Sequence, residues 1–160
     1  MIRPHRPPWW ALAVVVPLVV AACGSGGGLG QGAGGASSDA KLKTAGATVQ
    51  RQIAAYRAAT QRCTGASSPV VCIETADRTL GGQVHTYANL LAVGKGFTAP
   101  AGLLTSARNE AQTLANSLEI LGDAQPTQAN YDQVRNTFDV NGALTQLERA
   151  VTALNAALAG

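Results

Sequence analysis

The sequence predicts an all-α fold for residues 39–160, an antiparallel four-helix bundle of up-down-up-down topology. Apolar residues recur at three-four spacing in four segments, residues 40–63, 72–93, 104–121 and 131–158. Glycine and proline separate these segments, and no stretch shows the sustained alternation typical of a strand. Because the connections are short, consecutive helices are expected to lie side by side in opposite directions.

The first 22 residues have the pattern of an export signal. The positive segment "MIRPHRPPWW" is followed by the apolar run "ALAVVVPLVVAA". A membrane-spanning helix needs about 20 apolar residues, so this run is too short to span. A charged start, a short apolar middle and small residues before a cut are typical of a secretory leader. Residues 1–22 are therefore predicted to be removed.

The end of this leader resembles the lipobox of bacterial lipoproteins. Val20, Ala21 and Ala22 place an aliphatic and two small residues directly before Cys23. The resemblance implies a diacylglycerol on the Cys23 sulfur and a protein held at the cell membrane, facing the extracytoplasmic side. Two or three acyl chains hold a protein firmly, whereas one holds it only marginally. The alternative is an ordinary secretory leader followed by an incidental cysteine.

Residues 23–38 are predicted to be a linker that joins the lipidated cysteine to the folded domain. The stretch "GSGGGLGQGAGGASS" is rich in glycine and serine. Such a chain behaves as a flexible coil, and about 15 residues reach roughly 20 Å. Together with an excess of arginine over lysine, nine to three, the lipobox and this linker resemble small Ala- and Gly-rich lipoproteins of high-GC Gram-positive bacteria.

Two cysteines mark the turn between the first two predicted helices. Cys63 closes the first segment and Cys72 opens the second. An exported protein meets an oxidising space, where such a pair is expected to form a disulfide. A redox motif would have two residues between its cysteines, and a zinc site would need two further ligands. A structural bridge in the first helical hairpin is therefore predicted.

The paired glycines Gly81 and Gly82 interrupt the second helix. A glycine inside a helix is about 1 kcal/mol less favourable than alanine, so the pair needs a reason. The favoured interpretation is a kink, and a very close approach of another helix would serve as well. A further interpretation is a kink that opens a small apolar pocket between Tyr56, Tyr87 and Tyr131. The turn "GKG" at residues 94–96 is expected to end this helix, with a glycine in the left-handed conformation.

The stretch "TFDVNGALTQLE", residues 137–148, resembles the calcium loop of helix–loop–helix proteins. The resemblance makes Asp139, Asn141 and Glu148 candidate calcium ligands. Thr137 stands where the pattern has its first aspartate, so a principal ligand is missing. The alternative is a helix irregularity in which Asp139 or Asn141 caps the last segment.

Neither catalysis nor nucleic-acid binding is predicted. Once Arg3 and Arg6 leave with the leader, ten basic side chains stand against nine acidic ones, spread thinly along the chain. A nucleic-acid binder needs a clustered basic face. The only histidine left, His85, has no recognisable partners for acid–base work. We therefore expect no catalytic residue, no metal and no cofactor.

The sequence thus favours a lipid-anchored, non-enzymatic module that contacts another envelope component, a protein or a glycan. The alternative is a carrier of an apolar small molecule or lipid between the helices. A carrier needs an apolar cavity of a few hundred Å³, whereas a contact module needs a filled core and an exposed patch.

Overall fold

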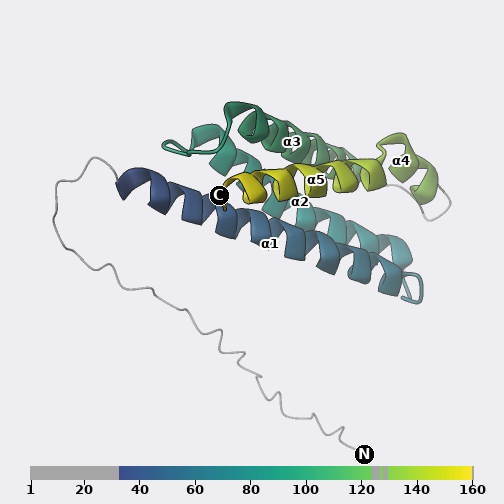
Figure 1. Cartoon of the computed structure of the whole chain (residues 1–160). Helices are drawn as coiled ribbons and strands as arrows, with labels where there is room; N and C mark the ends of the chain where they lie inside the picture. Colours follow the sequence, from purple (N-terminus) through teal and green to yellow (C-terminus); the bar gives the residue numbers. More distant parts are fainter. Residues whose placement is uncertain (1–32, 124–126, 128–129, 160) are drawn as a thin grey trace, which may run out of the picture. The chain divides into compact units, whose positions relative to one another are not determined.

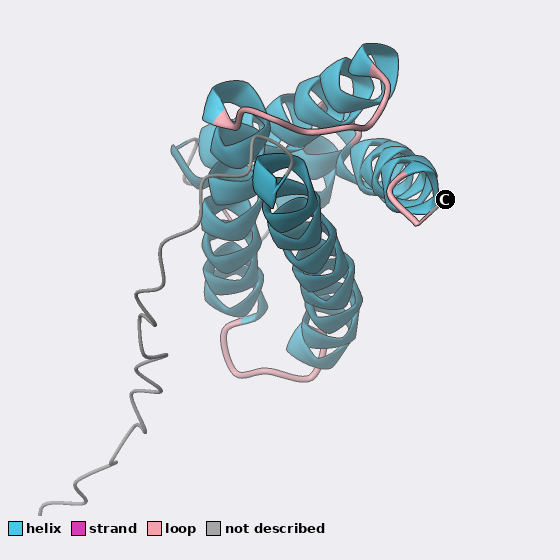
Figure 2. Ribbon diagram, turned by 60° about the vertical axis from the view of Figure 1, so that its left-hand side comes forward, coloured by secondary structure: helices cyan, strands magenta, loops and turns pink. Residues whose placement is uncertain are grey.

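The computed structural model describes residues 33–123, 127 and 130–159, and all regular structure in them is helical (Figure 2). The helices are α1 (Ala33–Cys63), α2 (Pro69–Val93), α3 (Ala101–Asp123), α4 (Tyr131–Thr137) and α5 (Val140–Ala157). The all-α prediction is confirmed. These described residues form five helices rather than four, because the last expected segment divides at Phe138 and Asp139.

The helix boundaries follow local backbone chemistry. Helix α2 begins at Pro69. Proline has no N–H, and in the first turn of a helix no hydrogen bond within the helix requires one. It ends at Val93, as expected, and the Gly94 N–H donates to the Leu90 carbonyl. The left-handed glycine of the turn is Gly96, with φ 76°, while Gly94 is extended. Helix α1 starts at Ala33, so residues 33–38 of the expected linker are helical.

The four long helices pack around one apolar core (Figure 1). Helix α1 contacts α2 and α5, and α3 contacts the same two helices. The larger buried side chains are mostly aliphatic and come from all four: Leu42, Ile53, Leu80, Val84, Leu114, Leu118, Leu121, Leu144, Leu147 and Leu154. These are the positions at which the three-four pattern places apolar residues, so the pattern identifies the buried faces correctly.

Helices α1 and α5 approach closely along one line of contact. A Cβ built on Gly46 of α1 would lie 2.8 Å from Asn155 Oδ1 of α5, so glycine permits this approach. Further along, the Arg57 guanidinium donates from Nη1 and Nη2 to the two Glu148 oxygens, at 2.6 and 2.8 Å. This bidentate pair is solvent-exposed, so it orients the two helices more than it stabilises them.

Helices α1 and α2 form a hairpin closed by a disulfide. Cys63 and Cys72 are bonded, with their Cα atoms 5.5 Å apart. The predicted bridge is thus confirmed. Since it joins the last residue of α1 to the first turn of α2, it restricts the turn in the unfolded chain as well as in the folded one.

Replacing both cysteines by serine should lower the free energy of unfolding by roughly 2.5 kcal/mol, the chain-entropy value for a loop of this length. Urea denaturation of the oxidised protein and of Cys63→Ser/Cys72→Ser measures the difference. Adding a reductant should destabilise the natural protein and leave the double variant unchanged. Equal stability of the two oxidised proteins would contradict the expectation.

Candidate functional site

The most unusual residue of the core is Asp77, on the buried face of α2. Its side chain is 0% exposed, and it is the one buried charged or polar residue among those that the structure describes. The Tyr56 hydroxyl of α1 donates to Asp77 Oδ1 at 2.6 Å. The Tyr131 hydroxyl of α4 donates to Oδ2 at 2.7 Å. One carboxylate therefore joins three helices.

This arrangement satisfies a group that would otherwise be unfavourable in an apolar core. A buried charge requires partners, and each Asp77 oxygen has a phenol donor. Burial and the Asp77 charge raise the pKa of both Tyr56 and Tyr131 well above the usual value. Because the phenols stay protonated, both keep a proton to donate. The Arg135 guanidinium of α4 lies over the Tyr56 ring, 5.5 Å from its centroid, and adds a nearby positive charge.

Tyr87 takes no part in this centre. It lies ten residues beyond Asp77 on α2, about 15 Å along the helix. Its ring is 2% exposed, and its hydroxyl has no hydrogen-bond partner in the described part of the chain. Burial raises the pKa of Tyr87 to about 12. The structure thus brings Tyr56 and Tyr131 together on a carboxylate and leaves Tyr87 within the apolar core.

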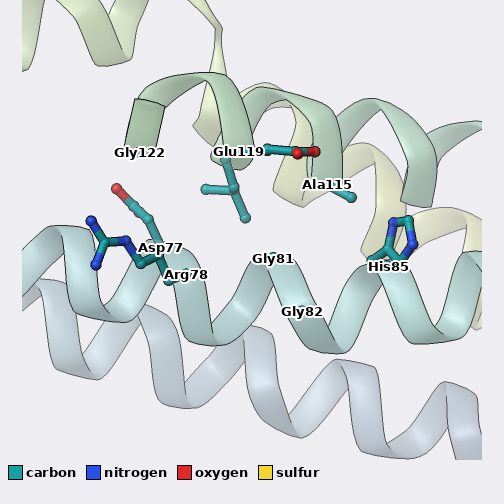
Figure 3. Close-up of a pocket in the computed structure, with 9 residues that line it drawn as sticks. Asp77, Arg78, Gly81, Gly82, His85, Ala115, Glu119 and Gly122 are labelled. Carbon is teal, nitrogen blue, oxygen red and sulfur yellow. The ribbon is translucent and has the colours of Figure 1, made fainter. Parts of the chain in front are cut away.

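Beside this centre, a hollow of about 420 Å³ opens between α2 and α3 (Figure 3). The paired glycines lie along its α2 side. A Cβ on Gly81 would reach ordinary contact with Leu118 of α3, at 3.5 Å, while a Cβ on Gly82 would meet nothing within 4 Å. Helix α2 runs unbroken through both glycines. A Cβ at position 81 would therefore fit against α3, and Gly82 leaves space that faces the hollow.

Charged and polar side chains surround the glycines that line the hollow. Arg78 and His85 lie on α2 at opposite ends of the hollow, with Glu119 on α3 between them (Figure 3). All three are exposed, while the buried Asp77 forms part of the lining. The hollow thus offers groups of both charge signs over a floor of glycine and alanine with one leucine, Leu118. Within the described residues, no three His, Cys, Asp or Glu side chains lie close enough to hold a metal ion.

The candidate calcium segment forms a helix start. Asp139 precedes α5, and its Oδ1 accepts a hydrogen bond from the Gly142 N–H at 3.2 Å. Glu148 lies nine residues on, about 14 Å along the helix axis, where it pairs with Arg57. Asn141 is exposed in the first turn of α5. The structure thus spreads the three candidate ligands along a helix, and Asp139 has the capping role that was the alternative.

Cys23 and the leader lie outside the described residues. Among the helices that the structure describes, none has the length and apolar character needed to cross a membrane. Comparison with protein-family models, curated proteins and solved structures finds no match to this chain. The site is therefore argued from its own geometry alone.

Sequence reasoning missed Asp77 and Arg135. One signal was present for Asp77. It lies four residues after Ile73 and three before Leu80, within the apolar stripe of the second helix. A carboxylate on a buried face requires donors, and Tyr56 and Tyr131 place hydroxyl donors on the apolar faces of their own segments. Nothing local marks Arg135, because its role depends on how α4 meets α1.

Removing the Tyr131 hydroxyl should destabilise the protein by about 1.5–3 kcal/mol, the range for hydrogen bonds to a charged group. Tyr131→Phe tests this, with Tyr87→Phe as a matched control. Since the Tyr87 hydroxyl is buried without a partner, its removal should be neutral or stabilising. Urea unfolding of the three proteins gives the comparison. A larger loss in Tyr87→Phe than in Tyr131→Phe would contradict the assignment.

Gly142→Ala should lose the cap of α5, because a Cβ there would collide with the Asp139 carboxylate. The expected loss is about 1 kcal/mol of unfolding free energy. Asp139→Asn is the control, since asparagine also caps helices and tolerates the positive φ of 42° at this position. Thermal unfolding measures both, and an undiminished stability of Gly142→Ala would rule out the cap as described.

Proposed function

We propose that this chain is a lipid-anchored helical module on the extracytoplasmic side of the cell membrane, without enzymatic activity, that binds another component of the envelope. The anchor is a lipid on Cys23, and a protein partner is favoured over a glycan. The observation that carries the proposal is the hollow between α2 and α3, with its small-residue floor and charged rim. Such a surface accepts a protruding side chain and supplies charges that orient it.

The proposed architecture is an antiparallel four-helix bundle of α1, α2, α3 and α5, with α4 as a short addition. Pairs of contacting residues support it. Between α1 and α2, Cys63 meets Cys72 and Tyr56 meets Asp77, so one residue number rises as the other falls. Between α1 and α5, Gly46 adjoins Asn155 and Arg57 meets Glu148, so these two helices also run in opposite directions. A bundle of this kind presents its hollow on a rigid surface.

A partner that fills the hollow should be excluded by a larger side chain at Gly82. Because a Cβ at Gly82 meets no atom within 4 Å, Gly82→Leu should fold at least as stably as the natural protein. Loss of one central contact weakens binding by roughly 30-fold. The measurement is cross-linking in intact envelopes followed by capture of the tagged lipoprotein.

Gly102→Leu is the matched control, because Gly102 also lies in a helix with open space around it but outside the hollow. The proposal expects one partner that is recovered with the natural protein and with Gly102→Leu, and lost with Gly82→Leu. Recovery of the same partners with all three proteins would contradict a role for the hollow.

A carrier of a small apolar molecule is the second candidate. The hollow has the volume of a small-molecule site, for which about 300–1,000 Å³ is usual. Its charged rim and its opening to solvent fit a protein contact better than an apolar cargo. The two uses differ in whether a small molecule stays bound to the purified protein.

A further inference from the structure

The end of the domain at which the chain enters α1 carries an unusual charge pattern. The chain has three lysines, and all of them lie at this end: Lys41 and Lys43 in the third turn of α1, and Lys95 in the turn after α2. All three are exposed. None forms an ion pair with another residue of the described ranges.

Two observations show that these lysines share one end of the fold. The Asp39 carboxylate of α1 accepts hydrogen bonds from Thr98, from its N–H at 3.0 Å and from its hydroxyl at 2.5 Å. A Cβ built on Gly96 would lie 3.7 Å from Ser38 Oγ. The turn that contains Lys95 therefore lies against the start of α1.

Little negative charge opposes the lysines there. Among the described residues of this end the acid is Asp39, whose single negative charge stands against the three positive charges of the lysines. Along α3, which begins next to the turn, the first acid is Glu110, about 14 Å beyond the helix start. The large apolar side chain of Val93 lies beside Lys95 and is 75% exposed. This end thus combines positive charge with an exposed apolar residue.

We infer that this end of the domain, Lys41, Lys43, Lys95 and Val93, docks onto the anionic lipid surface of the membrane. The inference rests on the proposed lipid anchor at Cys23. Cys23 precedes Ala33, the first residue of α1, by ten residues, so an anchored chain would hold this end nearest to the lipid. Each lysine near an anionic leaflet adds attraction, and three together favour docking on the order of 100-fold.

Docking would also orient the hollow. Arg78 and Gly122 of its lining lie toward the opposite end, since Arg78 follows the first turns of α2 and Gly122 is near the end of α3. With the lysine end on the lipid, that part of the hollow faces away from the membrane. A tethered domain that tumbled freely would show no such preference.

The test uses tryptophan as a reporter of lipid contact. Both natural tryptophans, Trp9 and Trp10, precede Cys23, so the processed chain has none. Val93→Trp places one at the lysine end, and Val71→Trp is the matched control at the opposite end of α2, where Val71 is 60% exposed. Each full-length lipoprotein is incorporated into vesicles of brominated phosphatidylglycerol and phosphatidylcholine, and quenching of its emission is measured. Intact mass tests whether Cys23 carries the lipid.

The expected result is several-fold stronger quenching of Val93→Trp than of Val71→Trp. The difference between the two reporters should vanish under each of three conditions. The first is a vesicle of brominated phosphatidylcholine alone, and the second is about 1 M salt, at which charges are screened within about 3 Å. The third is the Lys41→Gln/Lys43→Gln/Lys95→Gln background. Equal quenching of the two reporters, or quenching indifferent to the lysines, would overturn the inference while leaving the anchor intact. An intact mass without diacylglycerol on Cys23 would instead overturn the anchor, and the docking with it.

Discussion

The arrangement of the helices depends on the burial of the Asp77 carboxylate between the phenols of Tyr56 and Tyr131. An unpartnered charge in this core would be strongly destabilising, so α1 and α4 must both present their hydroxyls to α2. Apolar packing alone tolerates small shifts between helices, whereas two hydrogen bonds to opposite oxygens of one carboxylate do not. The pair of bonds therefore selects one register from those that the apolar core would allow.

Helix α4 shows how far this constraint reaches. A helix of seven residues is not stable alone in water, and α4 extends only from Tyr131 to Thr137. It is held by the Tyr131 hydroxyl on Asp77, by the Arg135 guanidinium over Tyr56, and by Val134 packed against the core. The buried centre thus supports both the long helices and this short one. Asp77 also forms part of the lining of the hollow that we propose as the binding surface. The position of α2 beside the hollow therefore depends on the hydrogen bonds of this carboxylate.

Most of the fold could be predicted from the sequence because it depends on local signals. The three-four pattern predicts the buried faces, the two cysteines predict the turn of the first hairpin, and the glycines at 94–96 predict the end of α2. The division of the last segment was harder to predict. The apolar pattern runs from Tyr131 to Leu158 almost without a break, but Asp139 adopts a positive φ and caps a new helix. That choice depends on Gly142, whose lack of a side chain leaves room for the capping carboxylate.

The candidate site could be predicted only in part because it is assembled from distant residues. The paired glycines need a reason, but the spacing could not show that a Cβ at position 81 would reach Leu118 while one at position 82 would face open space. Likewise, one interpretation of the sequence places an apolar pocket between the three tyrosines, whereas two of them bind Asp77 through their hydroxyls and Tyr87 does not. Which residues meet across helices depends on the registers that the buried carboxylate selects.

The central claim is that a lipid on Cys23 holds a binding module with a filled core, rather than a carrier. Native mass spectrometry of the protein extracted from envelopes, with intact mass beside it, tests both parts at once. The account predicts a chain that begins at Cys23 with a covalent diacylglycerol and retains no other small molecule. A non-covalent, lipid-sized ligand that stays on the natural protein and is absent from Gly82→Leu would show a carrier and contradict the account.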